Sequence, residues 1–379
     1  MDEVLRYKAE HTNNENHCDL IDGDLRKTIP VLHQLDSISL LWNADGVPIF
    51  KSSKFSIWPI QCTINELPPK IRKKHVLLCG LWFGTEKPVM NGNFLKRFVD
   101  ESISLETEGL DWVDQSGRNH NTKIVNLLCS CDSPARAMLQ NFKQYNGFYG
   151  CPYCLHEGER AVDNGNARIY PLNYPLPPLR NPLDTVAHAT VAIESGRAVF
   201  VVKGPSDLIL LPSFNLIESF TGEYLHSICL GVIRKFLAEW CETANAEYYI
   251  GNKIIQIDNR LQSIKPPMEV TRLPRSLVER KFWKGNEFRA FLLYSPVILS
   301  GILPNVYLSH WLLFVSDLYH RNLLTFNTHL ALHLPDCVRR CGPLWSTSSF
   351  VFVGFAGKLK SFIHEFKTLS KLHQPASAL

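Results

Sequence analysis

The sequence predicts an α/β core followed by a mainly helical segment. Up to about residue 142, short runs rich in β-branched and aromatic residues alternate with amphipathic helical patterns, and Gly, Pro or Asp bounds each run. Beyond residue 150, apolar residues recur mostly at helical spacing. The chain has 379 residues, of which 45% are hydrophobic, so two or three domains are expected.

Three strands are expected before the first long helix. Residues 37–46 form the first and end in Asp45-Gly46, whereas residues 55–69 form the second and are stopped by two prolines. Residues 75–84 form the third, and their nearly uninterrupted apolar run predicts a buried strand.

A helix and a fourth strand complete this part of the chain. Residues 92–110 are helical, with one apolar face that comprises Phe94, Leu95, Phe98, Val99 and Ile103. Residues 122–142 begin as a strand and turn at Asp132-Ser133-Pro134 into a second helix. The order of strand, strand, strand, helix, strand, helix is typical of the ribonuclease-H-like fold.

One aspartate ends the first strand and another ends the fourth. In a sheet of this order the two strands are neighbours, so Asp45 and Asp132 can approach each other although 132 − 45 = 87 positions separate them. Two adjacent carboxylates favour a hard cation such as Mg²⁺ or Mn²⁺. The alternative is that Asp45 belongs to a turn and Asp132 caps the following helix.

The second half carries a set of metal-ligand residue types. Cys151-x-x-Cys154 and the pair His329 and His333, expected on one face of a helix that Pro335 ends, make a tetrahedral zinc set. Because 329 − 154 = 175 positions separate the two halves, this is not a compact zinc finger, and core packing of the histidines is an open alternative. A long helix is also expected over residues 222–240, with Leu225, Ile228, Val232, Phe236 and Trp240 in one buried stripe.

Two further groups have both a functional and a structural interpretation. A basic run interleaved with aromatic residues is either a phosphate-contact surface or a solvated helix face, and it comprises Arg275, Arg280, Lys281, Lys284 and Arg289. Glu223 is more simply a residue favoured at a helix start than a ligand, and His226 follows it at helical spacing.

Composition excludes several classes of protein. The formal charge of +4 is compatible with DNA but below that of a DNA-coating protein. The polar first residues do not resemble a secretory signal, and no run is long enough to span a bilayer, so an intracellular protein without a membrane partner is expected. The eleven cysteines are then buried residues, metal ligands or reactive thiols.

The chain resembles the transposases of CACTA-like (EnSpm/Tnp2-type) DNA elements, in their animal branch. Six collinear segments, which cover most of residues 38–360, carry the resemblance. They are NADGVPIFKSSKFSIWPIQCTINELPP, GLWFGTEKPVMNGNFLKRFV, CDSPARAMLQNFKQYNGFYGCPYC, EYLHSICLGVIRKFL, LPRSLVERKFWKGNEFRAFLLY and FNTHLALHLPDCVRRCGPLWSTSSFVF.

The resemblance implies a ribonuclease-H-like DDE nuclease with a mainly helical, zinc-binding insertion. The implied boundaries are a lead-in at 1–36, a first core part at 37–150, the insertion at 151–335 and a C-terminal helical part at 336–379 that completes the core. It also implies that Asp45 and Asp132 are the first two catalytic acids and that Cys151, Cys154, His329 and His333 bind structural zinc.

The third acid of the family should follow Gly342-Pro343-Leu344-Trp345, and its expected position holds Val353. A substitute is not obvious, because Glu365 lies about three helical turns further on. We therefore expect a catalytically inactive, transposase-derived protein that retains at most binding to DNA or to protein partners, including copies of itself. It would be nuclear if it binds DNA and otherwise cytoplasmic. The alternatives are an active Mg²⁺-dependent transposase and a zinc-stabilised protein-interaction module.

Overall fold

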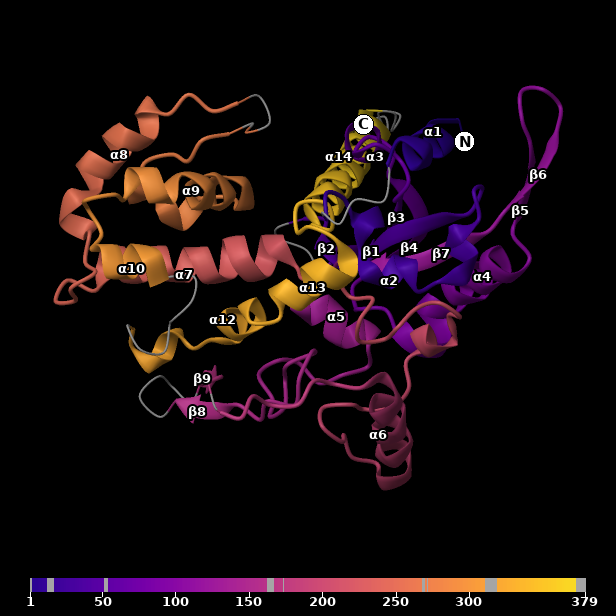
Figure 1. Cartoon of the computed structure of the whole chain (residues 1–379), viewed down its shortest axis with the longest axis horizontal. Helices are drawn as coiled ribbons and strands as arrows, with labels where there is room; N and C mark the ends of the chain where they lie inside the picture. The colour runs from indigo at the N-terminus through magenta and orange to yellow at the C-terminus, as the bar shows by residue number, and fades with distance from the viewer. Residues whose placement is uncertain are drawn as a thin grey trace, which may run out of the picture. The chain divides into compact units, whose positions relative to one another are not determined.

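The computed structural model describes residues 2–11, 17–50, 54–161, 167–172, 174–267, 270, 272–310 and 319–372 (Figure 1). It is a mixed α/β structure with two compact units. The sheet unit comprises residues 1–143, 181–222 and 336–379, and the helical unit comprises residues 144–180 and 223–335. Residues 181–222, which the family resemblance assigns to the insertion, belong to the sheet unit.

The main sheet contains both parallel and antiparallel strands. Its members are β1 (Ile38–Ala44), β2 (Val47–Pro48), β3 (Ser56–Ile64), β4 (Leu77–Gly84) and β7 (Ile124–Cys129). Strand β3 pairs antiparallel with β1, β2 and β4, whereas β1 pairs parallel with β7. The expected adjacency of the first and fourth predicted strands is therefore present.

A short segment continues the sheet beyond β7. Phe220 forms a parallel bridge with Cys129. The backbone N–H of Cys129 donates to the Ser219 carbonyl, and that of Thr221 donates to the Cys129 carbonyl, both at 2.9 Å. The order across the sheet is consequently β4, β3, β1, β7 and then residues 219–221.

Side chains of β1 alternate between two buried faces. Leu40, Trp42 and Ala44 pack in a core that includes residues of α4 (Leu95–Thr107) and α5 (Ser133–Leu139). Leu41 packs on the opposite face, with Phe352 of α14 (Phe350–Leu372) in the same cluster. The period of two in a strand explains why one short run serves both cores.

Strand β4 corrects one prediction. It was expected to be buried, but Leu77, Leu78, Leu81 and Phe83 are 43% to 58% exposed. The apolar composition is present, but β4 lies at an edge of the sheet, and within the described residues it pairs with β3 alone. Burial of a strand depends on partners that are distant in sequence, so an apolar run alone does not determine it.

The N-terminal residues belong to the core of the sheet unit. Leu20 and Leu32 are fully buried in the cluster that contains Leu41. Asp19 and Arg72 form a buried ion pair at 2.6 Å. The other elements of this unit are α1 (Asp2–Glu10), η1 (Leu20–Asp22), α2 (Asp24–Lys27), η2 (Pro30–His33), α3 (Pro69–Arg72), η3 (Met90–Phe94), β5 (Leu110–Val113), β6 (Asn119–Thr122), α6 (Pro182–Ser195) and η5 (Asp207–Leu210). The sequence did not predict the β5–β6 hairpin, which extends away from the sheet (Figure 1).

The helical unit is built around a long helix. This helix begins as η6 (Tyr224–Ile233) and continues as α7 (Arg234–Glu242), and its predicted stripe from Leu225 to Trp240 is buried. The other elements are β8 (Glu159–Ala161), β9 (Ala167–Ile169), η7 (Gly251–Lys253), α8 (Ile254–Ser263), η8 (Leu277–Phe282), α9 (Gly285–Ile298), α10 (Asn305–His310), η9 (Arg321–Leu323) and α12 (Phe326–Ala331). Helix α13 (Leu334–Cys341) begins at the end of this unit. Over the described ranges, no helix has the length and apolar character needed to cross a bilayer.

Candidate metal centre and the paired aspartates

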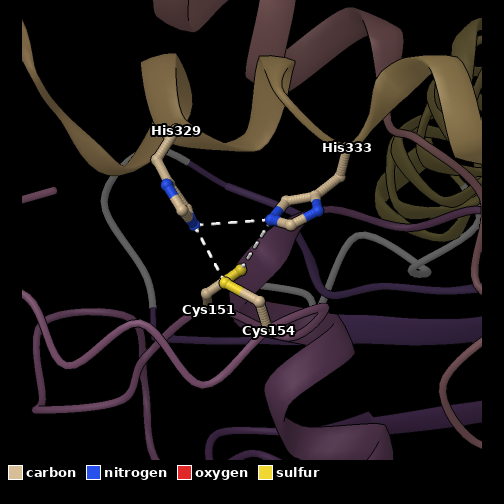
Figure 2. Close-up of side chains that lie close together, drawn as sticks. All are labelled: Cys151, Cys154, His329 and His333. Carbon is tan, nitrogen blue, oxygen red and sulfur yellow. Dashed lines mark hydrogen bonds between the residues drawn. The ribbon is translucent and has the colours of Figure 1, made fainter. Parts of the chain in front are cut away.

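The helical unit brings together the four residues predicted to bind zinc (Figure 2). Cys151 Sγ lies 3.5 Å from His333 Nε2, and Cys154 Sγ lies 3.3 Å from His329 Nε2. The two Nε2 atoms are 3.4 Å apart. The four side chains are buried, and their ligand atoms all lie within 4.8 Å of one another, so they can hold one metal ion.

These separations match the edges of a zinc tetrahedron. Zinc–sulfur bonds of about 2.3 Å and zinc–nitrogen bonds of about 2.0–2.1 Å give edges of about 3.6 Å between S and N and about 3.3 Å between two N atoms. The observed distances of 3.3 to 3.5 Å agree with both. Two thiols and two imidazoles leave no open position for substrate, which is typical of a structural zinc site.

Backbone contacts hold the turn that carries the two cysteines. The Tyr153 N–H points to Cys151 Sγ at 3.4 Å, a contact that favours the thiolate. Arg180 Nε donates to the Cys151 carbonyl at 2.8 Å, and its own backbone N–H donates to the Tyr153 carbonyl. Sequence reasoning did not identify Arg180, because 180 − 151 = 29 positions separate it from the first cysteine.

The two histidines come from the end of a short helix. Thr325 caps α12 by accepting from the Thr328 N–H, and His329 lies in the last turn of this helix. His333 lies beyond the end of α12, and Pro335 falls in the first turn of α13. The prediction that one helix carries both histidines and ends at Pro335 was therefore wrong, although the two rings do meet. Proline fits the first turn of a helix because no N–H is needed there.

Aromatic rings fix the orientation of the two imidazoles. The Tyr170 ring stacks on His329 with centroids 4.9 Å apart, and the Tyr153 ring lies 5.2 Å from that of His333. His329 Nδ1 is buried and has no hydrogen-bond partner in the described structure. The sequence held no local indication of Tyr170, which packs here from the end of the β8–β9 hairpin.

The two thiols have opposite pKa shifts. Burial raises the pKa of Cys151, but hydrogen bonds with Cys154, His329 and His333 outweigh burial and hold it well below its usual value. The hydrogen bond with Cys151, together with burial, raises the pKa of Cys154. One negative charge is thus already favoured in the cluster, and a bound cation would stabilise the second.

The sheet unit places Asp45 and Asp132 just beyond the ends of two neighbouring strands. Trp42 pairs with Cys129 in the parallel ladder of β1 and β7, and each aspartate follows three residues later. Asp45 accepts from the Gly46 N–H at 2.7 Å. Asp132 caps α5 by accepting from the Ala135 N–H at 2.8 Å. Asp45 therefore belongs to a turn and Asp132 caps a helix, as the alternative interpretation holds. Both residues also follow the strand ends at which the metal hypothesis places them.

No third ligand joins the two aspartates within the described part of the sheet unit. Val353 lies in the first turn of α14 and is 47% exposed, while the preceding residue, Phe352, is buried. Glu223, which belongs to the helical unit, caps η6 by accepting from the N–H groups of Leu225 and His226. The Glu365 side chain lies outside the described residues.

Three of the predicted nucleic-acid-binding residues, Arg275, Arg280 and Lys281, take part in ion pairs. Arg275 Nε lies 2.8 Å from the fully buried Glu287, and Arg280 lies 2.6 Å from Glu242. Lys281 is exposed and 4.0 Å from Glu242, Lys284 is exposed, and Arg289 is half-buried. These contacts reduce the positive charge that this run would offer to a phosphate.

Comparison with known proteins gives one family match. Residues 31–170 match the model of the transposase family tnp2, a range that includes both aspartates and the cysteine turn. No curated protein matches the chain. The match over residues 31–170 supports assigning this chain to the Tnp2 transposase family.

Proposed function

We propose that this chain is a transposase-derived protein whose ribonuclease-H-like core binds DNA but no longer cuts it. The observation that carries the proposal is the placement of Asp45 and Asp132 just beyond the ends of neighbouring strands, with a valine at the position expected for the third acid. The family match supports the lineage, and the loss of cleavage is our inference from these residues.

The order of the sheet supports the ribonuclease-H-like core. Three antiparallel strands, β4, β3 and β1, are followed by β7 and then residues 219–221, both in parallel pairing. Helix α14 contributes Phe352 to the core beside Leu41 and Leu128 of the two parallel strands. A third acid on the first turn of α14 would therefore be carried by an element that packs on the aspartate-bearing strands.

The chemistry of strand cleavage explains why Val353 matters. Two metal ions activate the attacking oxygen and stabilise the leaving oxygen, and carboxylates must hold both ions. Asp45 and Asp132 provide two carboxylates, whereas the valine side chain has no ligand atom. Within the described residues, the two aspartates are then not joined by the third carboxylate that the metal pair needs.

We also propose that Cys151, Cys154, His329 and His333 bind zinc, which fastens the cysteine turn to the end of α12. The donor set and the separations fit this ion, and a closed site of this kind stabilises structure. Magnesium or manganese would serve at Asp45 and Asp132 only if the active site is functional.

Binding to duplex DNA tests the proposed function. The purified protein should bind with an affinity that falls steeply with salt, because phosphate contacts release counterions. It should leave the duplex uncut in Mg²⁺ or Mn²⁺. Cleavage by the natural protein that is lost in Asp45→Asn would show an active transposase instead. Salt-independent or absent DNA binding would favour a protein-interaction module.

A further inference from the structure

Two cysteines outside the metal cluster lie in contact on neighbouring strands. Cys62 of β3 and Cys79 of β4 have sulfur atoms 3.2 Å apart. Between Ile60 and Gln61 the register of this pair shifts, so Cys79 is the extra residue of a bulge. A bulge redirects a side chain, and here it brings one thiol against another across the strands.

The two thiols differ in their access to solvent. All eleven cysteines of the chain are described, and only Cys18 and Cys79 are exposed. Cys62 is fully buried against the core that contains Trp42. The pair therefore combines one thiol that a small oxidant can reach with one that it cannot reach directly.

The electrostatics favour reaction at the exposed sulfur. The hydrogen bond with Cys62 lowers the pKa of Cys79 below its usual value, in spite of partial burial. The hydrogen bond with Cys79, followed by burial, raises the pKa of Cys62 well above its usual value. Because the thiolate is the reactive form, Cys79 is the attacking sulfur and Cys62 the resolving one.

We propose that Cys62 and Cys79 form a redox-sensitive dithiol, which hydroperoxides oxidise to a disulfide that links β3 to the edge strand β4. This inference does not rest on the proposed function. The oxidant is a hydroperoxide such as hydrogen peroxide, and the reductant that reverses the reaction is a low-molecular-weight thiol.

The reaction has two steps. The Cys79 thiolate attacks one peroxide oxygen, so an S–O bond forms, the O–O bond breaks and hydroxide leaves as water after protonation. The Cys62 sulfur then attacks the sulfenic acid at Cys79, so the S–S bond forms, the S–O bond breaks and the second oxygen leaves as water with the Cys62 proton. Two thiols and one hydrogen peroxide thus give one disulfide and two waters.

A second close pair provides an internal comparison. Cys129 and Cys131 have sulfur atoms 3.9 Å apart, and both are buried. They lack an exposed thiol that could take the oxygen from the peroxide. We expect this pair to stay reduced under conditions that oxidise Cys62 and Cys79.

The test is a thiol titration of the full chain after limited treatment with hydrogen peroxide. In denaturant the count should fall from eleven to nine, and peptide mapping without reductant should join the peptides that carry Cys62 and Cys79. Dithiothreitol should restore the count to eleven. Cys79→Ser should abolish the disulfide, whereas the matched exposed control, Cys18→Ser, should still form it.

A second variant separates the two steps. In Cys62→Ala the sulfenic acid at Cys79 has no resolving thiol, so it should accumulate and react with dimedone. A disulfide between Cys129 and Cys131, or a disulfide that survives Cys79→Ser, would overturn the proposal. Direct conversion of Cys79 to sulfinic acid while Cys62 stays a free thiol would also overturn it.

Discussion

The metal cluster of the helical unit and the aspartate pair of the sheet unit differ in completeness. The cluster gathers four buried ligand side chains with separations that match a zinc tetrahedron. The aspartates follow the ends of adjacent strands, but no third ligand joins them within the described sheet unit. Under the proposed function, the chain has kept a complete metal-ligand cluster and has lost one acid of its catalytic site.

The physical reason lies in what each site contributes to stability. Loss of one cysteine or histidine from the cluster would leave buried polar atoms without a metal, which destabilises the fold. Replacement of an exposed acid at the first turn of α14 by valine removes a charge but no packing. Such a change would alter catalysis far more than stability, so a chain that carries it can still fold.

Loss of the metal should produce the largest change in stability. We expect the natural protein to bind one zinc per chain and Cys154→Ala to bind none. The same substitution should lower the free energy of unfolding of the helical unit by several kcal/mol. Cys229→Ala is the matched control, because it removes a buried thiol of the same unit outside the cluster. It should keep the zinc and cost only about 1 kcal/mol. If both variants bound the same amount of zinc as the natural protein, the cluster would not be the zinc site.

The core position next to Val353 should have the second largest effect. Phe352 is buried with Leu41 and Leu128, so Phe352→Ala should cost about 3–5 kcal/mol in denaturant unfolding. The neighbouring Val353→Ala should change stability by less than about 0.5 kcal/mol, because the valine is half-exposed. Equal losses in the two variants would show that Val353 also anchors α14 to the sheet.

The aspartate that caps α5 should have a smaller effect, and one that depends on the substitution. Asp132→Ala removes the acceptor for the Ala135 N–H and should cost about 1 kcal/mol. Asp132→Asn keeps an acceptor and should cost only a few tenths of a kcal/mol. A large loss in Asp132→Asn would indicate that the carboxylate charge itself stabilises the fold, and the catalytic interpretation would then need another control.

The smallest loss of stability is expected for an acid at position 353. Val353→Glu places a negative charge in the first turn of α14, where the helix dipole favours it, so stability should stay equal or rise by up to about 1 kcal/mol. Thermal unfolding of this variant checks the expectation. A clear loss of stability would mean that the position does not accommodate an acid in this chain.

Local patterns predicted the elements that carry the aspartates. The β-forming residues of 37–46 and the turn at Asp132-Ser133-Pro134 are short-range features, and both appear in the structure as expected. The exposure of β4 and the packing of residues 181–222 could not be predicted, because both depend on contacts between distant segments. The meeting of the cysteine turn with His329 and His333 is of the same kind. The spacing of these four residues did not decide whether they form one site, and only the family resemblance implied that they do.

Strand cleavage by Val353→Glu tests the central claim most directly. Natural protein, Val353→Glu and Val353→Glu with Asp132→Asn should be compared on one DNA duplex in Mg²⁺ and in Mn²⁺, since asparagine keeps the cap of α5 but removes the charge. We predict that only Val353→Glu cuts, and that Asp132→Asn abolishes this cleavage. Cleavage by the natural protein, lost when Asp45 or Asp132 is replaced by asparagine, would contradict the account.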